Sequence, residues 1–271
     1  MTASMRLLAA CLLASTAALA EPVCPRQSLA RVSFPAGERL EFRLDAFGAD
    51  VGTFDLTFER GNNGAAWTMK SRAKTSAFIS TNVKQYEAYV AVSTTRDFLP
   101  LHYREDVDEG VAHKSAETDF PAKADTLAVR VTTAGKAEDL QLAAGPETRE
   151  LLTSLFFLRA QPLRQGQPIC AEVYAGRKMW KVTGSVAARE TIDTPLGRFP
   201  TVRIDATAVR IDDANARRAA HLWLTDDDRR LPVVAIGEVR GRTLRAQLTD
   251  ASSLPRKRAQ AAETRRNAIG R

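Results

Sequence analysis

Histidine side chains are the groups of this chain best suited to acid–base or metal chemistry near neutral pH. The sequence contains three: His102, His113 and His221. If the segments on either side of the Asp108–Gly110 turn pair as strands, His113 lies close to Asp106, and such a pair can orient a base or a metal ligand. On an exposed hairpin a histidine–carboxylate pair is usually a surface contact, so we predict that no histidine is catalytic.

Two acidic runs, Glu105–Glu109 and Asp226–Asp228, could attract calcium. Neither run has the alternating aspartates, the glycine and the distal glutamate of a calcium-binding loop. The sequence also lacks the GxSxG nucleophile elbow, the HExxH zinc motif, the Walker phosphate loop and the GxGxxG dinucleotide motif. We therefore predict no catalytic residue, no cofactor and no metal, and we expect the protein not to be an enzyme.

Residues 1–20 have the pattern of a secretory signal peptide. A short basic start precedes the uncharged run Leu7–Leu19, and small residues flank the predicted cleavage site between Ala20 and Glu21. We therefore expect export to the periplasm. The alternative is an outer-membrane lipoprotein anchored through Cys11; the apolar segment before that cysteine is short, which favours cleavage after Ala20.

Cleavage after Ala20 would leave two cysteines, Cys24 and Cys170. Two thiols in an oxidising compartment are candidates for a disulfide, which would fix the mature N-terminus to the body of the protein. We predict this bond; the alternative is that both thiols are free.

The basic charge of the chain is concentrated near its C-terminus. The formal net charge is +7, and residues 255–271 carry six Lys or Arg residues against the single acid Glu263. We expect this tail to be disordered, because it has few large apolar residues; contact with an anionic surface is the alternative. Residues 21–254 are expected to form a single domain, and no nucleic-acid partner is expected.

The body of the chain reads as a series of β-strands. From Glu38 to Phe47, apolar and polar residues alternate with the period of two that places one strand face on a core. Residues 61–64, Gly-Asn-Asn-Gly, predict a hairpin turn. The predicted strands are 38–47, 51–60, 67–74, 84–93, 101–107, 112–120, 126–132, 167–175, 178–187, 201–211, 219–225, 231–239 and 243–248; the fourth also fits a helical face.

One helix is predicted, from Pro146 to Arg159, with an apolar stripe that would cover a sheet face or close a barrel end. The fold class is therefore mainly all-β: a curved antiparallel sheet, half-barrel or barrel of about a dozen strands with one short covering helix. Residues 89–101 also resemble residues 221–233, each with a Leu-Pro that leads into a further strand.

Several segments together resemble a known family. In order along the chain they are Phe34–Phe42, Gly52–Phe54, Lys74–Ser76, Leu158–Leu163, Thr194–Phe199, Trp223–Val233 and Gly241. This order is similar to that of an exported bacterial family catalogued as domain of unknown function 3108. The resemblance implies a Gram-negative envelope protein with a curved β-sheet, and it implies no established activity and no functional residues.

Three functions fit these observations. We favour a binding or chaperone-like module that shelters an apolar ligand such as a lipid, with a cavity lined by Phe42, Leu44, Phe54, Leu56 and Phe58. The alternative is a structural or assembly factor of the cell envelope that acts through protein–protein contacts. A hydrolase of envelope polymer comes third, because the catalytic motifs are missing.

Overall fold

The computed structural model describes residues 24, 27, 29–30, 34–122, 125–239 and 241–254. The predicted signal segment, the Ala20–Glu21 junction, Cys11 and the basic tail 255–271 lie outside the described residues. Within the described part of the chain, no helix is both long and apolar enough to cross a lipid bilayer.

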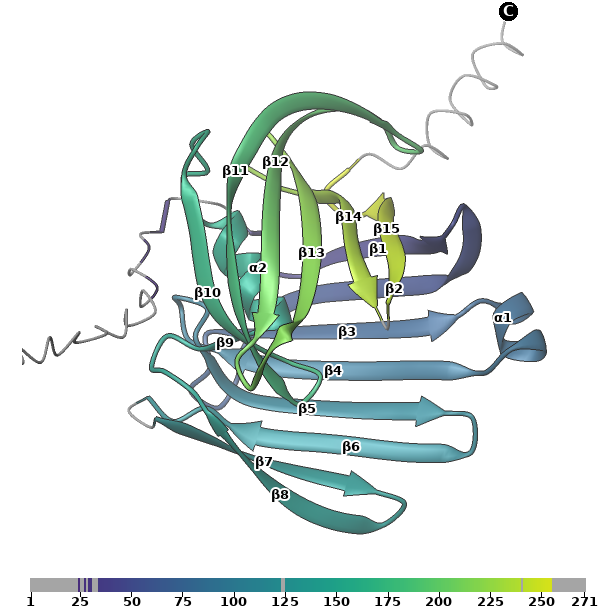
Figure 1. Cartoon of the computed structure of the whole chain (residues 1–271). Helices are drawn as coiled ribbons and strands as arrows, with labels where there is room; N and C mark the ends of the chain where they lie inside the picture. Colours follow the sequence, from purple (N-terminus) through teal and green to yellow (C-terminus); the bar gives the residue numbers. More distant parts are fainter. Residues whose placement is uncertain are drawn as a thin grey trace, which may run out of the picture.

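Fifteen strands of the described chain form one curved sheet (Figure 1). They are β1 (Glu38–Ala46), β2 (Ala49–Arg60), β3 (Trp67–Thr75), β4 (Tyr86–Thr94), β5 (Pro100–Glu109), β6 (Ala112–Asp119), β7 (Thr126–Thr133), β8 (Lys136–Ala143), β9 (Arg149–Glu150), β10 (Pro168–Ala175), β11 (Lys178–Thr194), β12 (Gly197–Arg210), β13 (Asp213–Thr225), β14 (Pro232–Val239) and β15 (Arg242–Ala251). Helix α1 (Ala77–Asn82) connects β3 to β4, and α2 (Leu151–Arg159) follows β9.

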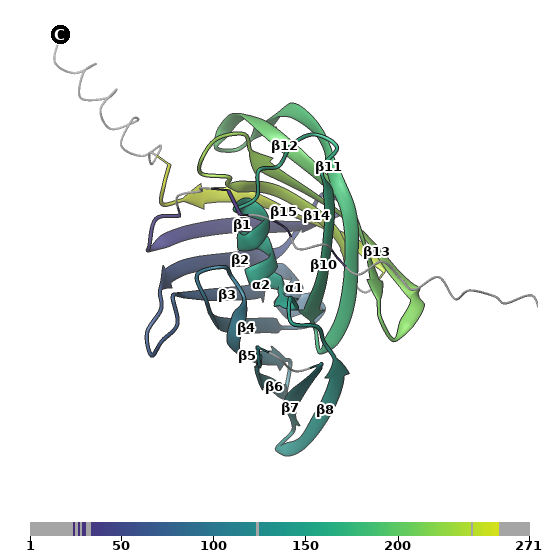
Figure 2. The same ribbon diagram turned by 90° about the vertical axis from the view of Figure 1, so that its left-hand side faces the viewer.

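The sheet consists of two meanders that meet at its centre. Its strand order is β8-β7-β6-β5-β4-β3-β2-β1-β15-β14-β13-β12-β11-β10-β9, so the first and last strands of the chain pair with each other. Every pair is antiparallel except β9 with β10. The sheet curls until β5 contacts β9, and α2 lies on its concave side (Figure 2). The predicted mainly β fold, a curved antiparallel sheet with a short covering helix, is confirmed.

Alternating side chains explain how the central strands bury one face. In β1, Leu40 and Phe42 are buried, whereas Arg39 and Glu41, which alternate with them along the strand, are exposed. The predicted turn at residues 61–64 is present, and Asn63 and Gly64 both adopt the positive φ that such a turn requires. Residues 84–93, for which a helix was the alternative, lie largely within β4.

The helix on the concave side begins later than predicted, at Leu151 instead of Pro146. Arg149 and Glu150 pair with β10 as the short parallel strand β9, which leaves them outside the helix. The Glu150 carboxylate then accepts hydrogen bonds from the first backbone N–H groups of α2, at Leu152 and Thr153. A side chain in this position defines the helix start, because it satisfies amides that have no partner within the helix.

Besides β9, two elements were absent from the sequence prediction, and both lack a buried face. Every residue of β8 is exposed except the half-buried Leu140 and Leu142, and α1 has no buried residue. Without burial there is no selection for an alternating or helical apolar pattern. Strands β11 and β12 also extend beyond their predicted bounds, into a long hairpin near whose tip Leu196 and Phe199 pack against the core, and β13 begins earlier than predicted, at Asp213.

The two segments with a shared Leu-Pro form matching turns in the two meanders, Thr95–Pro100 and Thr225–Pro232. In each, the threonine hydroxyl accepts a hydrogen bond from the backbone N–H of the leucine before the proline. Phe98 and Arg230, one residue earlier, both have a positive φ. Both turns face α2, so the resemblance lies where the two halves of the sheet hold the helix.

Candidate functional site

The concave side of the sheet is filled by α2 and by aromatic side chains that pack on it. Phe156 of α2 stacks on Phe58 of β2, with 4.7 Å between ring centroids. Phe42, Leu56 and Phe58, predicted to line a cavity, are buried in this hydrophobic core, and Phe54 packs against it. Leu44, the fifth predicted residue, is half-buried. The residues predicted to line a cavity therefore belong to a packed hydrophobic core or lie at its edge.

A cavity of about 70 Å³ lies at another place, where the β4–β5 and β6–β7 connections of the first meander meet the segment before β9. Among the residues that the structure describes, its lining carries no charged side chain: Thr95, Leu99, Pro100, Leu101, Phe120, Pro121, Ala122, Thr126, Leu127, Ala144, Gly145, Pro146 and Thr148. Pro100, Leu127 and Thr148 are buried and form the floor, whereas Pro121, Ala122 and Pro146 are exposed. The cavity is therefore a mainly apolar recess with an accessible rim.

Next to this cavity lies a buried group of two acids and two tyrosines, Tyr103, Glu105, Glu150 and Tyr174, here called the acid–tyrosine cluster. Glu150 and Tyr174 are register partners in the β9–β10 pair, so their side chains lie side by side. Tyr103 meets Tyr174 edge-on with 5.2 Å between ring centroids, and Glu105 lies two residues further on the same face of β5. The Phe120 ring of the cavity wall is 6.0 Å from that of Tyr174.

Burial changes the protonation of both acids. Desolvation raises the pKa of Glu150 to about 8, although the backbone N–H groups of α2 that it accepts from act in the opposite direction. Desolvation also raises the pKa of Glu105, and the nearby Arg177 guanidinium opposes this. At neutral pH Glu150 is therefore largely protonated.

Several buried polar atoms near this place have no hydrogen-bond partner within the described chain. They are the Tyr174 hydroxyl, Oε2 of Glu105 and, on the cavity floor, the Thr148 hydroxyl. Burial also raises the pKa of both tyrosines, so their hydroxyls remain protonated and can donate. This arrangement suits hydrogen bonding to a small uncharged group. Among the described residues, no three His, Cys, Asp or Glu side chains are grouped to hold a metal.

The three histidines lie elsewhere, on the half-exposed outer parts of the sheet, and each has a carboxylate beside it. The Nδ1 atoms of His102, His113 and His221 lie 2.8, 2.9 and 2.7 Å from carboxylates of Asp119, Asp108 and Asp205. His113 and Asp106 are also near each other, with 3.9 Å between Nε2 and Oδ1. Each histidine pairs across neighbouring strands, and the structure does not bring the three together.

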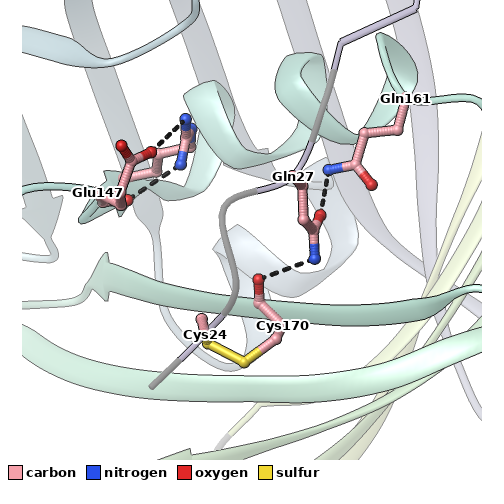
Figure 3. Close-up of a disulfide and its surroundings, with 6 residues drawn as sticks. Cys24, Gln27, Glu147, Gln161 and Cys170 are labelled. Atoms are coloured by element: carbon pink, nitrogen blue, oxygen red, sulfur yellow. Dashed lines mark hydrogen bonds and ion pairs between the residues drawn. A yellow bond between two sulfur atoms is a disulfide. The ribbon is translucent and has the colours of Figure 1, made fainter.

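The two cysteines left after the predicted cleavage are joined: a disulfide links Cys24 to Cys170 of β10 (Figure 3). Two further described residues near the N-terminus contact the C-terminal end of α2 and its surroundings. Gln27 donates to the Cys170 carbonyl at 3.2 Å and accepts from the Gln161 side chain, and the Ala30 amide donates to the Ala160 carbonyl. The disulfide thus helps to hold residues 24, 27, 29 and 30, here called the strap, at that end of α2.

Residues 40–248 match the family model of a protein of unknown function, DUF3108. The chain belongs to the DUF3108 family. The resemblance seen in the ordered segments of the sequence is thereby confirmed, and the matched residues contain nearly the whole sheet, α2 and the acid–tyrosine cluster.

Two solved structures are similar to this DUF3108 protein at low sequence identity. A β-barrel-like protein of domain of unknown function DUF1849 from Brucella abortus has a TM-score of 0.56 and 11% identity, over 80% of this chain and 97% of that one. A protein with a YmcC-like fold from Bacteroides fragilis has a TM-score of 0.35 and 6% identity, over 83% and 100% of the two chains. The first likeness shows the fold alone.

A short local similarity joins this DUF3108 chain to pentalenic acid synthase from Streptomyces avermitilis, with 38% identity over 77 residues. The match covers 26% of this chain and 18% of the synthase. The chain thus spans less than a fifth of that relative's length.

Glu150→Gln should make the stability of the DUF3108 fold less sensitive to pH. In the folded protein the pKa of Glu150 is about 8, above its ordinary value of 4.5. Between pH 4.5 and about pH 8, the folded protein therefore keeps a proton on Glu150 that the unfolded chain has lost. Stability therefore falls as pH rises between these values, on the order of 5 kcal/mol for this group. The stability of the Glu150→Gln variant should not show this decrease with pH. The raised pKa of Glu105 contributes a further decrease in stability with rising pH, which is the same in both proteins.

Urea unfolding at about pH 5 and about pH 9 measures the effect, since the midpoint reports stability at each pH. Glu138→Gln, on the exposed strand β8, is the matched control and should follow the wild type. If the Glu150→Gln and wild-type midpoints stay parallel across this range, burial does not hold the Glu150 proton.

Proposed function

We propose that this protein is exported to the periplasm of a Gram-negative bacterium and works there, without catalysis, as a binding module for an apolar ligand such as a lipid chain. The observation that carries this proposal is the uncharged recess with a buried floor and an exposed rim. Ligand sites are concave and mainly apolar, with a few placed polar groups. The signal-like segment 1–20 and the Cys24–Cys170 disulfide support export, because disulfides persist in oxidising compartments.

The size of the recess defines which part of a ligand it can take. At about 70 Å³ it has about half the volume of the roughly 150 Å³ cavity known to bind benzene. Pockets that enclose whole drug-sized ligands are several times larger, roughly 300–1,000 Å³. The recess therefore fits the end of an alkyl chain, and the rest of the chain would lie outside the rim formed by Pro121, Ala122 and Pro146.

Native mass spectrometry of gently purified protein tests the proposal by detecting a bound small molecule. We expect an apolar molecule to accompany the wild type and to be lost from Ala144→Phe, which places a large ring in the recess. Ala137→Phe adds the same ring at an exposed position of β8 and should retain the molecule. If the wild-type protein neither retains an apolar molecule on purification nor binds one that is added back, the proposal is contradicted.

A second candidate, an assembly factor that acts through protein–protein contacts, is favoured by an exposed apolar rim at the opposite end of the first meander. Phe47, Phe78, Val83 and Val111 are 81%, 70%, 73% and 108% exposed. They lie on the β1–β2, β3–β4 and β5–β6 connections, which are side by side in Figure 1. Grouped exposed apolar residues mark interaction sites.

The same purified sample separates the two candidates. A binding module retains a small apolar molecule whose loss depends on Ala144. An assembly factor retains one protein of defined mass, and Phe47→Ser should release it without affecting the recess.

A further inference from the structure

The floor of the recess contains one polar group whose hydrogen-bonding capacity is unused. Thr148 is 4% exposed, it lines the recess, and its Oγ1 has no hydrogen-bond partner within the described chain. A buried hydroxyl without a partner is unfavourable, so such a group in a binding recess points to a ligand that supplies the partner. The other two threonines of the recess differ: the Thr95 hydroxyl already accepts from the Leu99 amide, and Thr126 is exposed.

The charge around the recess restricts what that partner can be. No described residue of the lining is charged, so an ammonium or carboxylate group would lose its hydration without a counter-ion among those residues. Anions are disfavoured further by the Glu172 carboxylate, whose Oε2 accepts from the Gly145 amide at the edge of the recess. An uncharged group is therefore the partner that the site can accommodate.

A hydroxyl group is the uncharged partner that uses the threonine fully, because both hydroxyls can donate and accept. We propose that the recess is a subsite for the hydroxyl end of an aliphatic alcohol, with the alkyl chain against Leu99, Leu127 and the Phe120 ring and the alcohol oxygen hydrogen-bonded to Thr148 Oγ1. This inference rests on the proposed function, whose apolar ligand it narrows to a chain with a neutral alcohol end.

Four-carbon probes suit the recess and separate the chemical classes. We would measure dissociation constants by NMR titration for butan-1-ol, 1-fluorobutane, butanoate and butylammonium, and for glucose as a hydroxyl source without an alkyl chain. Wild-type protein should bind butan-1-ol about five- to tenfold more tightly than 1-fluorobutane, which has the same chain but no hydroxyl. Butanoate, butylammonium and glucose should bind more weakly than the alcohol.

Two matched variants assign the hydroxyl contact. Thr148→Val keeps the shape of the side chain and should abolish the preference for butan-1-ol over 1-fluorobutane, while Thr148→Ser should keep it. Tyr174→Phe is the control, since it removes an equally buried hydroxyl without a partner that does not line the recess. This control should bind both probes as the wild type does.

The outcomes distinguish failure of this inference from failure of the proposed function. If both four-carbon neutral probes bind equally in wild type and Thr148→Val, the recess is apolar but has no hydroxyl subsite, and only the inference is wrong. Tighter binding of butanoate, butylammonium or glucose also overturns it. If no alkyl probe binds the wild type, the proposed function fails as well.

Discussion

Replacing Arg159 by methionine should lower the free energy of unfolding by about 3 to 5 kcal/mol, because it leaves the Glu38 carboxylate buried without its partner. The Arg159 side chain is 0% exposed and that of Glu38 is 1% exposed. Two parallel hydrogen bonds join them, at 2.7 and 3.0 Å. This bidentate pair links the C-terminal end of α2 to the first strand of the sheet, β1.

The remaining donors of Arg159 explain why few other residues could replace it. Its Nε donates to the Arg230 carbonyl at 3.0 Å, and one Nη donates to the Arg229 carbonyl at 2.9 Å. Its guanidinium carbon also lies 4.4 Å from the centre of the Phe34 ring. Lysine provides one compact charge instead of a planar fork, so Arg159→Lys should also be destabilising.

Chemical denaturation of three variants measures this prediction. Arg159→Met and Glu38→Gln should each lower the midpoint, and the double variant should recover part of the loss, because it removes both buried charges. Arg130→Met is the matched control: its ion pair with Asp139 is exposed, and the midpoint should hardly move. Equal effects of Arg159→Met and Arg130→Met would show that burial adds nothing to the first pair.

The strands that bury one face could be predicted from the sequence, whereas the polar interior could not. Alternation placed Leu40 and Phe42 on the core face, and the structure agrees. Glu38 is in phase with Leu40 and is buried on the same face, and this phase is the signal that could have pointed to a buried acid. Its partner lies 121 residues away, and no local pattern connects two positions so far apart in the chain.

The acid–tyrosine cluster was missed for a related reason. Glu105 belongs to an acidic run that suggests a surface turn, yet it is in phase with Tyr103 and Val107, which are both buried. Glu150 fits the first turn of a predicted helix, but it becomes the residue before the helix because β9 pairs with β10. An acid in phase with apolar neighbours on a strand is the useful signal, since it is costly to bury without compensation.

The recess at Thr148 depends on connections rather than on strands. Its lining comes from the β4–β5 and β6–β7 turns, from β7 and from the segment before β9. Turn residues carry no periodic pattern, and their meeting is set by the curl of the whole sheet. The sequence therefore predicts a concave sheet, but it does not predict where α2 leaves part of that concave side open.

Removing the disulfide by a Cys24→Ser, Cys170→Ser double variant should lower the free energy of unfolding by about 2 to 5 kcal/mol. The bond closes a loop between residues 146 positions apart, and a cross-link over a long loop restricts the unfolded chain strongly. In the folded state it also helps to hold the strap at the C-terminal end of α2. The amides of that strap should then exchange faster with solvent, beginning with Ala30, which donates to the Ala160 carbonyl.

Thermal or urea unfolding with and without a reductant checks this prediction, with hydrogen exchange as the local readout. The reductant should lower the stability of the wild type to that of the double variant and leave the double variant unchanged. A stability loss without faster exchange at Ala30 would place the effect in the unfolded chain alone. No loss at all would mean that Gln27 and Ala30 hold the strap without the covalent bond. In that case the folded state would not depend on an oxidising compartment, in which disulfides persist.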